Sequence, residues 1–132
     1  MKKIKRWLPV SLCKKLSKET FKDVERVWTR RGDISGWCIE KREKAMRRKF
    51  VSSVLYYKYP CPIFEELLAV VLSKPGIEFS LSNDPLGFVV TLKDNNDWLM
   101  CKSCGVGKTP IEALCRAYLE AVEEGLFDDK WR

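Results

Sequence analysis

Apolar residues recur with a helical period at the start of the second half of the chain. Pro62 suits a first helical position, and the apolar residues after it keep helical spacing until Lys74-Pro75-Gly76 ends the run. These residues are Ile63, Phe64, Leu67, Leu68, Val71 and Leu72. The pattern predicts one amphipathic helix that begins near residue 62.

The next stretch changes from a helical period to alternation. Two tight turns, Asn83-Asp84-Pro85-Leu86-Gly87 and Asp94-Asn95-Asn96-Asp97, divide it into three short segments. The alternating apolar residues are Ile77, Phe79 and Leu81, then Phe88, Val90 and Leu92, and finally Trp98 and Met100. Three short strands joined by tight turns predict an antiparallel meander.

The last apolar stripe begins at a strong helix start signal. The Thr109 hydroxyl can cap the helix, Pro110 suits its first turn, and Glu112 can return a hydrogen bond to the Thr109 amide. The stripe consists of Ile111, Leu114, Cys115, Tyr118, Leu119 and Val122, and Gly125 is suited to end the helix. The order α-β-β-β-α therefore follows for residues 62–124.

The first half of the chain predicts two basic helices. Ser17 or Thr20 can cap the first, and Gly32-Asp33 ends it. Its apolar residues, Phe21, Val24, Val27 and Trp28, leave Lys22, Arg26, Arg30 and Arg31 mostly outside. The second begins at about Glu40, and its apolar residues are Met46, Phe50, Val54 and Tyr57. The predicted fold class is α+β, with these two helices before the α-β-β-β-α unit.

Composition and charge divide the chain near residue 59. With 132 residues, 45% of them hydrophobic, the chain can bury one ordinary core. Residues 1–58 carry 18 Lys and Arg against 6 Asp and Glu, whereas residues 59–132 carry 7 against 12. We expect a basic segment at 1–59 and the α-β-β-β-α unit at 60–132 in one compact domain. A chain with one basic half and one acidic half is an electrostatic dipole. Its basic half attracts phosphates or an acidic protein surface, and the opposite charges of the two halves favour head-to-tail homo-oligomers. A solvated, lysine-rich surface without a partner is the simpler explanation of the same charge.

The start of the chain imitates a signal peptide without completing one. Only seven residues, Trp7 to Cys13, separate its basic clusters, Pro9 interrupts them, and no small-residue cleavage site follows. No stretch approaches the roughly 18 to 20 apolar residues of a membrane span. We therefore expect a cytoplasmic protein with no membrane partner, whose six cysteines stay reduced.

Short motifs in the second half resemble a known family. They are the strand start Gly87-Phe88, the loop end Gly107-Lys108-Thr109-Pro110 and the stretch Glu112-Ala113-Leu114-Cys115-Arg116-Ala117. Over about residues 60–125 the chain resembles the ABA sandwich domain family of small phage proteins. The resemblance implies a helix-sheet-helix fold and a phage or prophage origin within a bacterial host cell. It implies no particular chemistry and no functional residues.

The basic half supplies the candidate binding residues. For contact with phosphate or an acidic surface, the candidates are Arg30, Arg31, Arg42, Arg47, Arg48 and Lys49. Tyr56 and Tyr57, beside Lys58 and Tyr59, add stacking surfaces that suit single-stranded nucleic acid or a nucleotide. Packing of these tyrosines against the sheet is the simpler explanation of the same residues.

The sequence Gly105-Val-Gly-Lys108-Thr109 imitates the end of a phosphate-binding loop. That motif needs a glycine five positions before its second glycine, and this chain has Lys102 there. A weaker anion site remains at Lys108 and the amides that begin the last helix. The capping residues already account for the same sequence.

Cys101 and Cys104 have the spacing of half a structural zinc site. A complete tetrahedral site needs two more ligands, but the chain has no histidine and no second closely spaced cysteine pair. We therefore expect no cofactor, with zinc at Cys101 and Cys104 as a weak candidate.

The composition favours binding over catalysis. Histidine, the usual general base, is absent, and the acidic pairs lie near predicted helix ends, so a metal-dependent nuclease is the least economical hypothesis. We favour a non-enzymatic phage inhibitor of a bacterial defence system, anti-CRISPR-like, whose basic half binds nucleic acid or a nucleoprotein effector. The alternatives are a sponge for a signalling nucleotide, which needs a deep pocket, and a phage DNA- or RNA-binding accessory protein.

Overall fold

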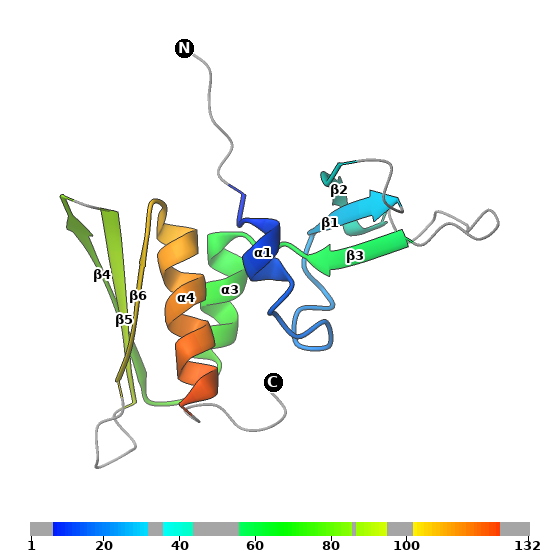
Figure 1. Cartoon of the computed structure of the whole chain (residues 1–132). Helices are drawn as coiled ribbons and strands as arrows, with labels where there is room; N and C mark the ends of the chain where they lie inside the picture. Colours follow the sequence, from blue (N-terminus) through cyan, green and yellow to red (C-terminus); the bar gives the residue numbers. More distant parts are fainter. Residues whose placement is uncertain (1–6, 32–35, 44–55, 86, 95–101, 125–132) are drawn as a thin grey trace.

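The structure contains two three-stranded antiparallel sheets with helices between them (Figure 1). It is a computed structural model that describes residues 7–31, 36–43, 56–85, 87–94 and 102–124. In chain order the elements are α1 (Val10–Cys13), β1 (Arg26–Arg31), β2 (Cys38–Lys41), β3 (Tyr56–Pro60), α3 (Phe64–Leu72), β4 (Ile77–Asp84), β5 (Gly87–Asp94), β6 (Lys102–Gly107) and α4 (Pro110–Glu123). The predicted α+β class is confirmed.

The C-terminal sheet, β4-β5-β6, is the meander that the alternating residues predict. β5 is its middle strand, with Val90 opposite Leu81 on β4 and opposite Gly105 on β6. The tight turn after β4 brings Asp84 opposite Gly87. α4 and α3 lie beside one face of this sheet (Figure 1). The predicted α-β-β-β-α order is therefore confirmed.

α4 approaches β6 so closely that two positions of the strand admit no side chain. A Cβ on Gly105 would lie 2.2 Å from the Ala113 carbonyl oxygen and 2.4 Å from the Ala117 amide nitrogen. A Cβ on Gly107 would meet the same helix at 2.7 Å. Ser103, next on this face, is buried and donates its hydroxyl to the Ala117 carbonyl oxygen at 2.9 Å. The glycines that imitate a phosphate-binding loop are therefore helix-packing residues.

The start of α4 follows its sequence signal. The Thr109 hydroxyl accepts the Glu112 amide at 3.2 Å, and Pro110 is the first helical residue. The Glu112 carboxylate accepts the Lys108 amide at 3.4 Å, whereas the sequence predicted the Thr109 amide. Gly125, expected to end this helix, lies outside the described residues. Across the described ranges, no helix has the length and apolar content that crossing a membrane requires.

Glu66 ties α3 to the chain before β1. Its carboxylate accepts hydrogen bonds from the amides of Ile63 and Glu25, both at 2.9 Å. The first bond closes the start of α3, where a helix leaves amides without intrahelical partners. The helix begins at Phe64 with Ile63 as its cap. Pro62, expected as the first helical residue, therefore precedes the cap.

One apolar core joins the two halves of the chain. Its first-half members include Leu8, Leu12, Leu16 and Phe21, and its second-half members include Leu67, Leu92, Leu114 and Tyr118. The Phe21 and Tyr118 rings meet edge to face, with centroids 5.8 Å apart. The segment from Leu8 to Val24 therefore covers the C-terminal helices.

The N-terminal sheet, β2-β1-β3, stands where the first basic helix was predicted. β1 lies in the middle, with Trp28 opposite Ile39 of β2 and Tyr59 of β3. Turns precede the strand. The helix predicted from residues 17 or 20 to 32 is therefore wrong.

The error has a physical reason. Val27 is 5% exposed and Thr29 is 3% exposed, while Trp28, which points to the opposite face, packs against the core. A strand covered on both faces loses the alternation that would identify it.

Two other predictions concern residues that lie largely outside the described ranges. The second basic helix falls mostly on residues 44–55, but its predicted ends, Glu40 and Tyr57, lie in β2 and β3. For the third strand of the meander, Trp98 and Met100 also lie outside, and β6 spans Lys102–Gly107. Residues 105–107, expected in a loop, therefore belong to a strand.

Candidate nucleic-acid interface

β1 carries a row of long side chains on one face of the N-terminal sheet. Arg26, Trp28 and Arg30 share this face, because alternate residues of a strand point the same way at intervals of about 6.6 Å. Trp28 donates its indole N–H to the Leu8 carbonyl oxygen at 2.8 Å and packs against the core. Trp28 thus fixes the middle of this row to the core, and a partly buried arginine lies at each end.

Arg30 belongs to a cluster of cations and rings, which we name the cation–aromatic surface: Lys14, Lys18, Arg30, Trp37 and Tyr59. The two rings lie 5.6 Å apart with their planes tilted by 51°. The Lys14 ammonium is 5.1 Å from the Trp37 centroid and 5.9 Å from that of Tyr59. The Lys18 ammonium is 5.0 Å from the Tyr59 ring, and the Arg30 guanidinium is 5.7 Å from the Trp37 ring. Three cations thus share two rings.

A second cation and ring meet at the other end of the row. The Arg26 guanidinium lies 5.6 Å from the centroid of Trp7, just before α1. Cations within about 6 Å of a ring are attracted to its face, by roughly 0.5 to 1 kcal/mol at exposed sites. Lys14 and Lys18 are exposed, while Trp37 and Tyr59 are partly buried. This arrangement offers stacking rings beside charges that can neutralise phosphates.

Buried thiols support the row from beneath. The Leu8 carbonyl oxygen that holds Trp28 also accepts the thiols of Cys13 at 3.6 Å and Cys61 at 3.8 Å. Hydrogen bonding with Cys61 and burial raise the pKa of Cys13, and burial raises the pKa of Cys115 to about 12. A thiol that stays protonated is a poor nucleophile and a poor metal ligand. Cys13 and Cys115 therefore serve packing.

The structure brings four of the predicted binding residues together. Arg30 and Arg31 end β1, and their partners across the sheet on β3 are Tyr57 and Tyr56 respectively. Arg30 also contacts Trp37, as described above. The sequence predicted Arg30 and Arg31 in one helix and Tyr57 in another, whereas the structure pairs their backbones across β1 and β3.

Arg42 makes contacts within the fold. Its amide donates to the Glu25 carbonyl oxygen at 2.8 Å, and its Nε donates to the Val24 carbonyl oxygen at 3.1 Å. These bonds tie the end of β2 to the chain before β1. Three other predicted contacts, Arg47, Arg48 and Lys49, lie outside the described residues.

Lys108 is separate from this cluster, at the start of α4. Its side chain is exposed, but its amide already donates to the Glu112 carboxylate at 3.4 Å. A carboxylate at this position opposes an anion by like-charge repulsion. The geometry therefore does not favour the predicted anion site.

The weak zinc candidate gains no partner in the described structure. Cys104 is an exposed residue of β6, and Cys101 lies outside the described residues. Within the described ranges, no three potential ligands are grouped to hold a metal ion. The cysteines described there are free thiols.

Sequence reasoning missed Lys14, Lys18 and Trp37 as members of the site. They meet because the N-terminal sheet and the segment after α1 fold against each other, which the helical interpretation of residues 17–32 hid. A local signal for the sheet does exist. The run Val27-Trp28-Thr29 and the tyrosines of residues 56–59 are β-branched and aromatic, a composition that favours strands.

Comparison of the chain with family models, with curated proteins and with solved structures gives no match. The functional argument therefore depends on the side chains and their geometry.

Proposed function

We propose that this protein binds single-stranded nucleic acid, alone or within a nucleoprotein, through the cation–aromatic surface. The observation that carries the proposal is the sharing of two rings by three cations at a surface in the basic half of the chain. Unpaired bases stack on aromatic side chains, and lysine and arginine neutralise the phosphates between them. A double helix keeps its bases stacked inside, so it would use the charges but not the rings.

The biological role that fits this activity is inhibition of a bacterial defence nucleoprotein. The resemblance of residues 60–125 to small phage proteins supports this role, and so does the concentration of positive charge in residues 1–58. A basic surface occupying the nucleic-acid path of an effector would block its target. A phage nucleic-acid accessory protein would use the same surface without an effector.

The test is binding of a fluorescent single-stranded oligonucleotide, followed by anisotropy at several salt concentrations. Lys14→Gln/Lys18→Gln removes two ring-bound cations, and Lys22→Gln/Lys93→Gln removes two positive charges outside the cation–aromatic surface. We expect wild-type affinity to fall as salt rises. The first variant should bind on the order of 10-fold more weakly, since each cation also loses its ring contact, and the control should lose less than about 3-fold.

Equal losses in the two variants would mean that net charge alone attracts the oligonucleotide. Absence of wild-type binding at low salt would overturn the proposal. The inhibitory role has a separate measurement, which is capture of a defence effector that survives nuclease treatment. Capture that disappears with nuclease would favour the accessory role.

A further inference from the structure

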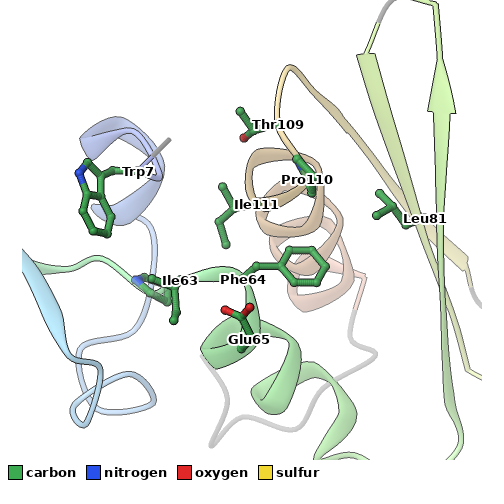
Figure 2. A pocket seen from close by; sticks show the side chains of 9 residues that line it. Trp7, Ile63, Phe64, Glu65, Leu81, Thr109, Pro110 and Ile111 are labelled. Atoms are coloured by element: carbon green, nitrogen blue, oxygen red, sulfur yellow. The ribbon is translucent and has the colours of Figure 1, made fainter. Parts of the chain in front are cut away.

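A cavity of about 570 Å³ opens between Trp7, the start of α3, the start of α4 and β4 (Figure 2). This volume is in the range of sites that hold small ligands or parts of larger ones. Figure 2 shows Trp7 and Ile63 on one side of the space, Leu81 on the other, and Phe64 and Ile111 between them. Chain segments from both halves of the protein therefore build one hollow.

The lining is suited to a flat, uncharged ring. Trp7, Phe64 and Pro110 supply ring surfaces, and Ile63 and Leu81 supply apolar edges. The charged side chain in the lining is that of Glu65, which is exposed at the start of α3. A carboxylate repels phosphate but can accept a hydrogen bond from a ring amino group. Charge therefore favours a nucleobase over a phosphate group in this space.

Trp7 connects the cavity to the row of side chains on β1. The indole that lines the cavity also lies 5.6 Å from the Arg26 guanidinium, at the end of the row opposite Arg30. A nucleic-acid strand whose phosphates follow the arginines therefore reaches Trp7, which is one of the residues that line the cavity. A base turned away from the phosphates at that point would enter an apolar space.

We infer that the cavity takes one unstacked nucleobase of a single strand bound along the N-terminal sheet. This inference rests on the proposed function and adds a base-binding site to it. Burial of a base face against aromatic and apolar side chains is tolerant of sequence, because every base has a flat π surface. The phosphates then set the salt dependence, and the cavity adds affinity that depends on the base.

Two exposed apolar residues of the cavity rim allow a test that leaves the core and the charge intact. Ile63 and Leu81 are 37% and 41% exposed, so Ile63→Ser/Leu81→Ser removes apolar rim with little loss of packing. Leu72→Ser/Val106→Ser is a matched control, because these residues are both 49% exposed and lie outside the cavity lining. Urea unfolding of each variant verifies that it is folded.

The probes are two single-stranded oligonucleotides of equal length, one with bases and one with abasic sugars throughout. The rim variant should bind the base-bearing strand about 5- to 10-fold more weakly than wild type, as expected for one lost stacking contact. Its affinity for the abasic strand and its salt slope should not change. The control variant should match wild type with both probes.

Other outcomes separate the two proposals. If wild type binds with a salt slope but the rim variant loses no base-dependent affinity, the cavity does not hold a base and this inference is overturned while the proposed function stands. A peptide side chain of a partner protein would then be the better occupant. If wild type binds neither probe, the proposed function and this inference both fail.

Discussion

Both sheets have three antiparallel strands, but they use their side chains differently. In the C-terminal sheet, the face toward α4 carries glycine and buried apolar residues. The other face carries short side chains such as Ser80 and Thr91 together with the charged Glu78 and Lys93. In the N-terminal sheet, three alternate residues of the middle strand, Arg26, Trp28 and Arg30, share one face. The C-terminal sheet packs closely against α4, whereas the N-terminal sheet carries long cationic and aromatic groups on this face.

If the proposed function holds, the two sheets divide stability and binding between them. A helix that lies directly on a strand needs small residues beneath it, so long side chains are excluded there. Long cationic side chains need solvent for their charged ends, so they are absent from a sheet face that a helix covers this closely. We therefore expect substitutions in the C-terminal sheet to change the free energy of unfolding and substitutions on the cation–aromatic surface to change affinity.

The largest effect on stability is expected for Gly105→Ala. The new Cβ would lie 2.2 Å from the Ala113 carbonyl oxygen and 2.4 Å from the Ala117 amide nitrogen, so α4 must move away from β6. Overpacking of a close contact costs about 1 to 3 kcal/mol, and contact with rigid backbone places this change at or above about 3. Urea unfolding followed by circular dichroism measures the loss.

Gly36→Ala is the matched control for this change, because a Cβ at Gly36 meets nothing within 4 Å. We expect its free energy of unfolding to remain within about 0.5 kcal/mol of wild type. Similar losses for the two glycines would contradict the close packing of α4 on β6.

A second large effect on stability is expected from alkaline pH. Burial raises the pKa of Cys115 from 9.0 to about 12 and that of Tyr118 from 10.0 to about 12, and both residues lie on α4. Both groups stay protonated in the folded protein while the unfolded chain releases its protons. The contribution of these two groups to the free energy of unfolding is therefore fully present below about pH 9. It is lost as pH rises toward 12, by up to about 1.4 kcal/mol per pH unit for each group.

The measurement is the free energy of unfolding from pH 7 to 11 for wild type and for Cys115→Ala/Tyr118→Phe. The variant is less stable at pH 7 because it leaves a cavity and loses a hydroxyl, but its decline above pH 9 should be shallower. Parallel pH profiles for the two proteins would show that other groups cause the alkaline loss.

The smallest effect on stability, and a clear effect on binding, is expected for Trp37→Ala. Trp37 is partly buried and loses its contact with Tyr59 and with two cations, a change of about 1 kcal/mol in the free energy of unfolding. Affinity for a single-stranded oligonucleotide should fall roughly 5-fold or more, since one stacking ring is gone. Unchanged affinity in a folded Trp37→Ala protein would place the interface elsewhere.

The second half of the fold was predictable because its signals are local. The alternation around Phe79 and Val90 and the cap at Thr109 each involve residues close in sequence, and the structure contains the corresponding strands and helix. The first half of the fold was not predictable from local signals, because β1 pairs with strands on either side and is covered on both faces. Its apolar spacing then resembles that of a helix.

The candidate site divides in the same way. Sequence alone could name Arg30, and Tyr59 beside the candidate tyrosines, since their residue types suit phosphates and bases wherever they lie. It could not identify Lys14 or Trp37, because these residues become neighbours only when α1 and the N-terminal sheet fold together. Residue type is written in the sequence, but proximity between distant residues depends on tertiary packing.

By itself, the sequence therefore determined the charge asymmetry, the C-terminal meander and the start of the last helix. Tertiary structure alone decided that Gly105 and Gly107 make room for α4 and that residues 26–31 form a strand. It also decided that Lys14 shares one ring with Arg30 and another with Lys18. The physical reason is the distance along the chain over which each kind of interaction acts. Periodicity and capping act within a few residues along the chain, whereas close approach of a helix to a sheet and the gathering of cations around rings require segments that only the folded chain brings together.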